Sequence, residues 1–231
     1  LEAANSLGYH WQKVEKFIDA SKCSGSGDCM LGCKTGAKWT GRVYGDEAVA
    51  GGADLRLHAN VKDVIVENGK AAGVALKNGE RYYGKAVVLS AGGLSNVHML
   101  RGAGIEEAGT GLCCDWLSFV QGIIPGTNSL GATPMSVGTI EHYDEDGLCI
   151  LPVAPNWALF LGIIALSGPK HFLKMANFMR YTSIMVKVQD DTTGEIKKGR
   201  AFSKPLTAND QKKIDKGVQI ITKIFKKAGA K

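Results

Sequence analysis

The sequence predicts a mixed fold in which an α/β part precedes an α+β part with an antiparallel sheet flanked by helices. Three observations predict it. Short apolar runs separated by turns at Asn68-Gly69 and Asn78-Gly79 are typical of β-hairpins. The continuous apolar run 86–90 is typical of a strand buried on both faces of a sheet. Residues 207–229 have the spacing of an amphipathic helix with a capping box at Thr207 and Asp210.

The composition is that of a folded protein with one large domain or two small ones. Of its 231 residues, 45% are hydrophobic and 22% are charged, so disorder is not expected. Thirty glycines are many for this length and indicate tight turns and close backbone approaches. Such glycines are typical of nucleotide-binding α/β proteins.

The positive charge has a local origin. The formal net charge is +6, and much of the excess lies on the predicted last helix. A solvated lysine face explains this excess better than phosphate binding, because no aromatic side chains alternate with the lysines. Nucleic acid is therefore not expected as a partner. The lysines concerned are Lys212, Lys213, Lys216, Lys223, Lys226, Lys227 and Lys231.

Neither a leader nor a membrane span is expected. Residues 1–5 have neither a basic start nor an apolar run, and the first residue is Leu1, as in a fragment or a processed product. The most apolar stretch, 157–166, has about ten residues, whereas a membrane-spanning helix needs about 20. This stretch is expected to be core or a docking surface.

The elements expected along the chain alternate in type. The first part should hold helices at 1–20 and 35–50, a glycine-rich cysteine loop between them, and a short helix near 95–101. The second part should hold two short helices within 157–179 and the helix that ends before Gly229. Strands are expected at 54–58, 61–67, 71–77, 86–90, 119–124, 134–142, 148–153 and 181–189.

Three thiols lie close together in the loop, at Cys23, Cys29 and Cys33. Glycines around them would let the backbone curve about one centre, and thiolates select iron–sulfur clusters or zinc. Their spacing matches neither the usual zinc knuckle nor the common four-cysteine ferredoxin runs. Three local ligands suit a three-iron cluster, or a four-iron cluster with a distant fourth ligand. Zinc, three free buried thiols, or a disulfide with one thiol left over are the alternatives.

Several motifs, in the right order, resemble the glucose-methanol-choline (GMC) oxidoreductases. The segment 29–40 resembles a signature of bacterial and archaeal members, and Gly73-Val74 resembles a hairpin strand of the family. The segment 86–105 resembles the family stretch that passes under the dinucleotide, and 185–210 resembles the end of its substrate domain. The resemblance covers most of the chain and is weakest between 112 and 178.

The resemblance implies FAD as a cofactor and assigns residues to it. The backbone of Val61 would hold the adenine, and Ser90, Ala91, Gly92 and Gly93 would pass beside the dinucleotide. Residues 1–110 would be part of a Rossmann-like FAD-binding domain with a β-hairpin insert. Residues 111–205 would form the substrate domain, closed by the helix 206–231.

The resemblance also bears on the cysteines. Sugar dehydrogenases of this family carry a 3Fe-4S cluster on cysteines of similar spacing, which favours 3Fe-4S over 4Fe-4S at Cys23, Cys29 and Cys33. Related members keep comparable cysteines with no cluster established.

Two features that the family needs for catalysis are not in the sequence. There is no Gly-x-Gly-x-x-Gly loop for the pyrophosphate and no C-terminal segment with the catalytic histidine. None of the five histidines is expected to be the catalytic base, and the chain alone is expected to be inactive. Partner polypeptides would supply the missing ends.

The resemblance implies a function for the assembled enzyme. It would pass hydride from a small alcohol or sugar to FAD, and electrons onward through the cluster to an acceptor protein. The alternative is a non-catalytic electron-transfer or assembly module. The thiols and the absent export signal favour the cytoplasm, with membrane association through a partner as a further option.

Overall fold

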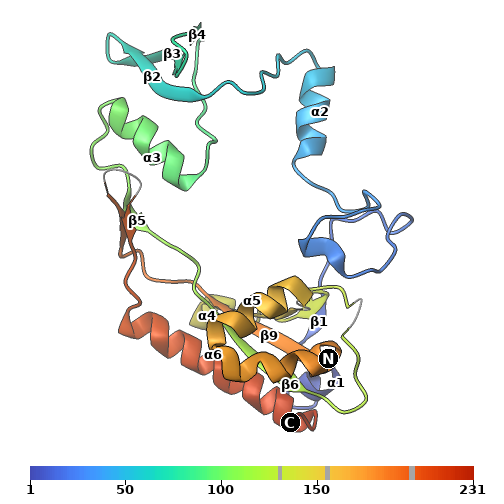
Figure 1. The fold of residues 1–231 in the computed structure, drawn as a ribbon. Coiled ribbons are helices and arrows are strands. Elements are labelled where there is room, and N and C mark those ends of the chain that lie inside the picture. Colours follow the sequence, from blue (N-terminus) through green and yellow to red (C-terminus); the bar gives the residue numbers. More distant parts are fainter. Residues whose placement is uncertain (130–131, 154–156, 198–200) are drawn as a thin grey trace. The chain divides into compact units, whose positions relative to one another are not determined.

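We describe the protein from a computed structural model, which covers residues 1–129, 132–153, 157–197 and 201–231 (Figure 1). The chain divides into two compact units. The first, here called the sheet unit, consists of Leu1–Val43, Asp115–Asp190 and Leu206–Lys231. The second, here called the hairpin unit, consists of Tyr44–Cys114 and Asp191–Pro205. The domain boundaries predicted near residues 110 and 205 stay a prediction.

A three-stranded antiparallel sheet is the centre of the sheet unit. Its order is β6 (Leu117–Ile123), β9 (Tyr181–Val188) and β8 (Leu148–Val153). In the middle of the sheet, Ile184 pairs with Val120 on one side and Val186 pairs with Ile150 on the other. Apolar residues dominate these strands and several of them are β-branched, which suits a pleated and buried surface.

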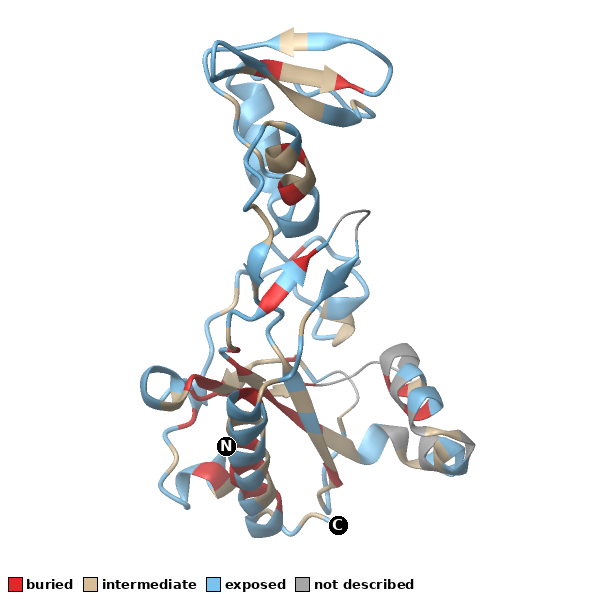
Figure 2. Ribbon diagram, turned by 90° about the vertical axis from the view of Figure 1, so that its left-hand side faces the viewer, coloured by how far each residue is buried: buried red, intermediate tan, exposed pale blue. Residues whose placement is uncertain are grey.

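Helix α6 (Ala208–Lys227) packs on this sheet and forms the main core with it. Ile221 and Val186 are fully buried there, and Figure 2 shows buried positions along the strands and along α6. Burial of each such side chain contributes roughly 1.5–3 kcal/mol. The helix begins as the sequence predicts, because the Thr207 and Asp210 side chains each accept a hydrogen bond from the other's backbone N–H.

Smaller elements complete the sheet unit. They are α1 (Glu2–Asn5), β1 (Gln12–Lys13), η1 (Asp28–Met30), β7 (Val137–Gly138), α4 (Tyr143–Asp146), α5 (Trp157–Ser167) and the 3₁₀ segment η2 (Pro169–Arg180). Strands β1 and β7 pair with each other, and α1 contacts α6. No helix within the described ranges is long and apolar enough to cross a membrane.

The hairpin unit contains the meander β2 (Val61–Glu67), β3 (Lys70–Leu76) and β4 (Arg81–Tyr83). Asn68 and Gly69 both have positive φ, 51° and 74°, so this turn has the sign pattern that the Asn-Gly pair predicts. Helix α3 (Gly93–Gly102) packs on β2. A second small sheet joins β5 (Thr110–Leu112), β10 (Gly194–Ile196) and β11 (Phe202–Ser203). Helix α2 (Arg42–Ala50) contains the first junction between the units.

The predicted helix 1–20 is wrong beyond α1. Gly8 has φ 85°, which ends a right-handed helix, and the chain then turns so that Trp11 enters the core. The Asn5 side chain bonds both backbone groups of Trp11 and so competes with helix formation. The predicted helix 35–50 begins only at Arg42, because Gly36 has φ 67° and the following residues pair with the backbone near Ile18 through an antiparallel bridge to Lys38.

Three of the predicted strands are also wrong in whole or in part. At 54–58 the chain is irregular and His58 has φ 60°. The run 86–90 is not a strand, because no other strand of the described chain lies beside it, and Val88 is 85% exposed. Only Val137–Gly138 forms a strand within 134–142.

The fold class is confirmed at the level of helices combined with antiparallel sheets. Every strand pair among the described residues is antiparallel. A parallel, Rossmann-like arrangement is not among them, so this part of the fold stays a prediction.

Candidate nucleotide-binding site

The hairpin unit contains a pocket of about 620 Å³ where the start of β2, the end of β3 and α3 meet. Its volume lies within the usual range of small-molecule sites. The pocket exists because α3 packs on β2 and brings the segment before the helix to the edge of the meander. It is lined by Ala59, Asn60, Val61, Lys62, Lys77, Ala91, Ser95, His98 and Met99.

Two of the five residues predicted to contact FAD, Val61 and Ala91, lie on this pocket. Ser90, Gly92 and Gly93 flank Ala91 in the chain but are not among the lining residues. Gly92 caps α3 with φ 85° and ψ 159°, a conformation that is essentially restricted to glycine. The backbone conformation, and not lack of space, favours glycine here, since a Cβ would meet nothing within 4 Å.

Asn96, which the sequence analysis missed, holds the segment before α3 in place. Its Oδ1 accepts a hydrogen bond from the Ala91 N–H at 3.0 Å, and its Nδ2 donates to the Leu89 carbonyl at 3.1 Å. An asparagine five residues after a strand-like run is a weak signal, because only the fold shows that the two segments face each other. The segment 89–91 is therefore positioned by a side chain of α3 rather than by a sheet.

The polar groups of the pocket are basic or neutral. Lys62 pairs with Asp63 at 3.3 Å, while Lys77 makes no ion pair within the described ranges. The His98 Nε2 atom is buried and has no hydrogen-bond partner in the described part of the chain. No carboxylate is among the lining residues. Cations and an unpaired imidazole nitrogen beside Val61 and Met99 suit a ligand with an anionic part and a flat apolar part, so a nucleotide fits this donor set.

The cysteine loop belongs to the sheet unit and lies apart from this pocket in sequence. Cys23 is exposed, Cys29 and Cys33 are half-buried, and all three are free thiols. The described residues contain no group of three His, Cys, Asp or Glu side chains placed to share a metal ion. The predicted cluster ligands therefore do not converge in this structure.

Cys33 differs from the other thiols in its hydrogen bonds. Its Sγ lies 3.5 Å from the Thr35 Oγ1 and accepts a bond from the Lys38 N–H at 3.4 Å. The Thr35 hydroxyl, followed by the Lys38 amide, lowers the pKa of Cys33 to about 7. Burial instead raises the pKa of Cys149.

We expect iodoacetamide at pH 7 to alkylate Cys33 more than about tenfold faster than Cys149, because the thiolate is the nucleophile. The Cys33 rate should rise with pH through about pH 7, since deprotonation creates the reactive form. Thr35→Val removes the largest cause of the shift and should move that rise to higher pH. Mass-spectrometric labelling of each cysteine measures this, and Ser24→Ala is the control. Equal rates for Cys33 and Cys149 would contradict the expectation.

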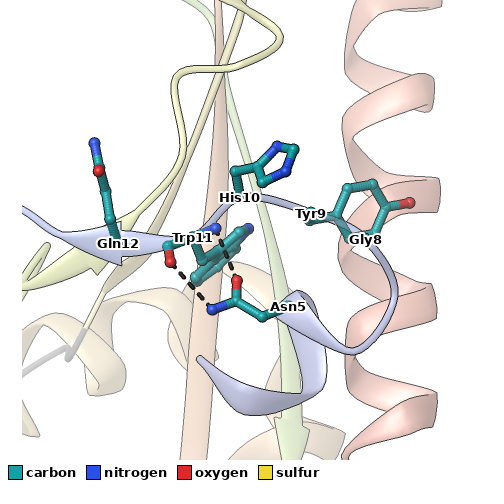
Figure 3. Close-up of a pocket in the computed structure, with 6 residues that line it drawn as sticks. All are labelled: Asn5, Gly8, Tyr9, His10, Trp11 and Gln12. Atoms are coloured by element: carbon teal, nitrogen blue, oxygen red, sulfur yellow. Dashed lines mark hydrogen bonds between the residues drawn. The ribbon is translucent and has the colours of Figure 1, made fainter.

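A second pocket, of about 340 Å³, lies beside the turn after α1 (Figure 3). Figure 3 shows the Asn5 side-chain amide hydrogen-bonded to both the N–H and the carbonyl of Trp11. The His10 Nδ1 and Glu141 Oε2 lie 2.8 Å apart. Burial opposes ionisation of Glu141, but hydrogen bonds from the His10 amide and ring outweigh it and lower the pKa of the carboxyl. These contacts hold the N-terminal turn in place within the sheet unit. We therefore assign this pocket a structural role and not a ligand-binding one.

Comparison with known proteins agrees with the resemblance seen in the motifs. Residues 1–131 match the family described as GMC oxidoreductase. The chain is 27% identical over 230 residues to the long-chain-alcohol oxidase FAO4A of Arabidopsis thaliana, covering 88% of the chain and 32% of that protein. It is 32% identical over 111 residues to the 2-methyl-1,2-propanediol dehydrogenase of Mycolicibacterium austroafricanum, covering 43% and 20%.

A third relative is archaeal. The chain is 26% identical over 225 residues to the uncharacterized protein MJ1450 of Methanocaldococcus jannaschii, covering 96% of the chain and 55% of that protein. The chain thus spans between a fifth and about half of the length of these relatives. Because the family match extends over more than half of its residues, the chain belongs to the GMC oxidoreductase family.

Proposed function

We propose that the chain is part of an FAD-dependent oxidoreductase acting on the CH–OH groups of alcohols or sugars, and that the hairpin-unit pocket holds the adenine-nucleotide half of the FAD. One observation carries the proposal. Val61 and Ala91, thirty positions apart in the chain, line one pocket together with Lys77 and the unpaired His98 Nε2. Family membership and the alcohol-oxidising activities named for two relatives support it.

The residues of this chain would bind and orient the cofactor. The backbone of Val61 would hold the adenine edge, as the resemblance implies, and Ala91 would allow close approach because its side chain is small. Lys77 would neutralise phosphate charge at the mouth of the pocket, and His98 Nε2 would gain the partner that it lacks. When bound, FAD supplies the hydride acceptor for oxidation of the alcohol.

Further features of the complete protein also belong to this proposal. In the complete protein, a Rossmann-like sheet would give the run 86–90 the strand neighbours that it lacks in the described chain. Partner polypeptides would provide the pyrophosphate-binding glycine loop, the catalytic histidine and an electron acceptor. A 3Fe-4S cluster on Cys23, Cys29 and Cys33 does not fit their present arrangement.

Nucleotide binding to the chain tests the pocket. Titration calorimetry should show that ADP binds and competes with FAD, whereas FMN, which lacks the adenine half, does not compete. Ala91→Phe fills the pocket and should weaken ADP binding by more than about tenfold, since the ring occupies the space of the base. Val88→Phe is the matched control, because Val88 is 85% exposed and does not line the pocket.

The assignment of the pocket fails if ADP does not bind, or if Ala91→Phe binds it as well as Val88→Phe does. The oxidoreductase activity needs its own measurement, on anaerobically purified native material with every copurifying chain identified. FAD with alcohol-dependent reduction of a dye would support the activity. The iron and acid-labile sulfide content of the same material would show separately whether an iron–sulfur cluster is present. Iron without flavin would favour a non-catalytic electron-transfer module.

A further inference from the structure

Helix α5 is apolar and exposes a large apolar side chain near its C-terminal end. Its sequence, from Trp157 to Ser167, contains no charged residue. Phe160 and Ile164 are buried, and the Phe160 ring lies 5.2 Å from that of Tyr181 at the start of β9. Leu166, by contrast, is 91% exposed. A helix without charged residues is normally buried in a core or in a membrane, so the exposure of Leu166 points to a missing cover.

The neighbouring segment η2 extends this apolar surface. It lies against α5, and in Figure 1 the two run side by side in orange. Leu173 is 87% exposed, and Phe172 and Met179 are also exposed. Single exposed apolar side chains are ordinary, but four large ones within the short stretch 166–179 are a concentration in sequence that points to an interaction surface. We call α5 and η2 together the apolar hairpin.

The charged residues within and beside the apolar hairpin in the sequence are of one sign. No aspartate or glutamate occurs between Asp146 and Asp190. Lys170 and Arg180, near the two ends of η2, are exposed. Two copies of the hairpin meeting face to face would therefore bring cations against cations with no carboxylate from the segment 147–189, which disfavours self-association through this surface. Apolar residues flanked only by cations match the surface of a bilayer that contains anionic lipids.

We propose that the apolar hairpin lies in the surface of an anionic lipid bilayer, with Leu166, Phe172, Leu173 and Met179 inserted among the acyl chains and Lys170 and Arg180 at the headgroups. Helix α5 has 11 residues, too few to span a bilayer, so the hairpin lies in the interface. This role uses residues outside the nucleotide pocket and does not depend on the proposed oxidoreductase function.

Vesicle flotation of the 231-residue chain tests the proposal. The chain should float with vesicles of phosphatidylcholine and phosphatidylglycerol, and less with vesicles of phosphatidylcholine alone. The double substitution Leu166→Ser, Leu173→Ser should lower the bound fraction more than about tenfold, because two apolar anchors are lost. Leu57→Ser is the matched control, since Leu57 is also exposed but lies in the hairpin unit. The double substitution Lys170→Glu, Arg180→Glu should abolish the preference for anionic vesicles and the sensitivity to salt.

Far-ultraviolet circular dichroism and thermal unfolding confirm that each variant folds. The proposal is overturned if the chain does not bind either vesicle, or if the leucine and charge variants bind as the unchanged chain does. It is also overturned if the leucine substitutions abolish self-association, measured by analytical ultracentrifugation, while vesicle binding is absent. That result would assign the surface to a second copy instead.

Discussion

Replacing Gly217 by alanine is expected to lower the free energy of unfolding of the sheet unit by about 2 kcal/mol. Gly217 is buried in α6, directly over Val186 of β9. A Cβ at this position would lie 2.8 Å from the Val186 Cβ, a separation that real Cβ atoms essentially never show. Val186 is itself fully buried, so its side chain has no free space into which it could turn. The helix would have to move away from the sheet.

Chemical denaturation followed by circular dichroism measures this loss. In an uncrowded helix the same change stabilises by up to about 1 kcal/mol, because alanine has the higher helix propensity. Gly45→Ala in α2 is therefore the control, since a Cβ at Gly45 would meet nothing within 4 Å. If Gly217→Ala proves as stable as Gly45→Ala, the close packing of α6 on β9 is incorrect.

Asp210→Ala is expected to cost about 2 kcal/mol, an effect of the same order. Asp210 is fully buried at the start of α6. Its Oδ2 accepts a hydrogen bond from the Thr207 N–H at 3.2 Å, and its own N–H donates to the Thr207 hydroxyl at 3.0 Å. Alanine would leave the Thr207 N–H without its partner and create a cavity. Asp210→Asn keeps an acceptor oxygen and should lose less.

The control for this second prediction is another aspartate of α6. Asp215 is exposed, and its Oδ1 accepts a hydrogen bond from the Gln211 Nε2 at 2.8 Å. Asp215→Ala should change the free energy of unfolding by less than about 0.5 kcal/mol, as is usual for surface substitutions. Equal losses for Asp210→Ala and Asp215→Ala in denaturant titrations would mean that the capping box does not stabilise α6.

Elements set by local chemistry could be predicted from the sequence. The Asn68-Gly69 hairpin, the capping box of α6 and strand β8 lie where the sequence predicts them, because turn residues, caps and β-branched runs act over a few residues. The helix expected over 1–20 is not there, because its apolar spacing reflects Trp11 entering a core built by distant residues. Tertiary contacts overrode the local pattern at that point.

The candidate site could be predicted only in part, for the same reason. Val61 and Ala91 were assigned to the cofactor through the family resemblance, and the structure places both on one pocket, although this does not test their role. Nothing in the sequence marked Lys77, Asn96 or His98 as residues of the site. Their roles there depend on the packing of α3 on β2, which the sequence does not show. The cysteine loop shows the reverse case, since three thiols on a glycine-rich loop, together with the family resemblance, predicted a convergence that the structure does not show.

The interleaving of the two units has a consequence for the order in which the chain folds during synthesis. The sheet unit needs Leu1–Val43 as well as Leu206–Lys231, and the hairpin unit needs Asp191–Pro205. Strand β6 leaves the ribosome long before β9, its partner through the pair Val120 and Ile184. The hairpin unit cannot be completed until Asp191–Pro205 has been synthesised, and the sheet unit must wait for Leu206–Lys231. Such distant pairings fold slowly. The apolar strands of the nascent chain should therefore depend on chaperones until α6 emerges.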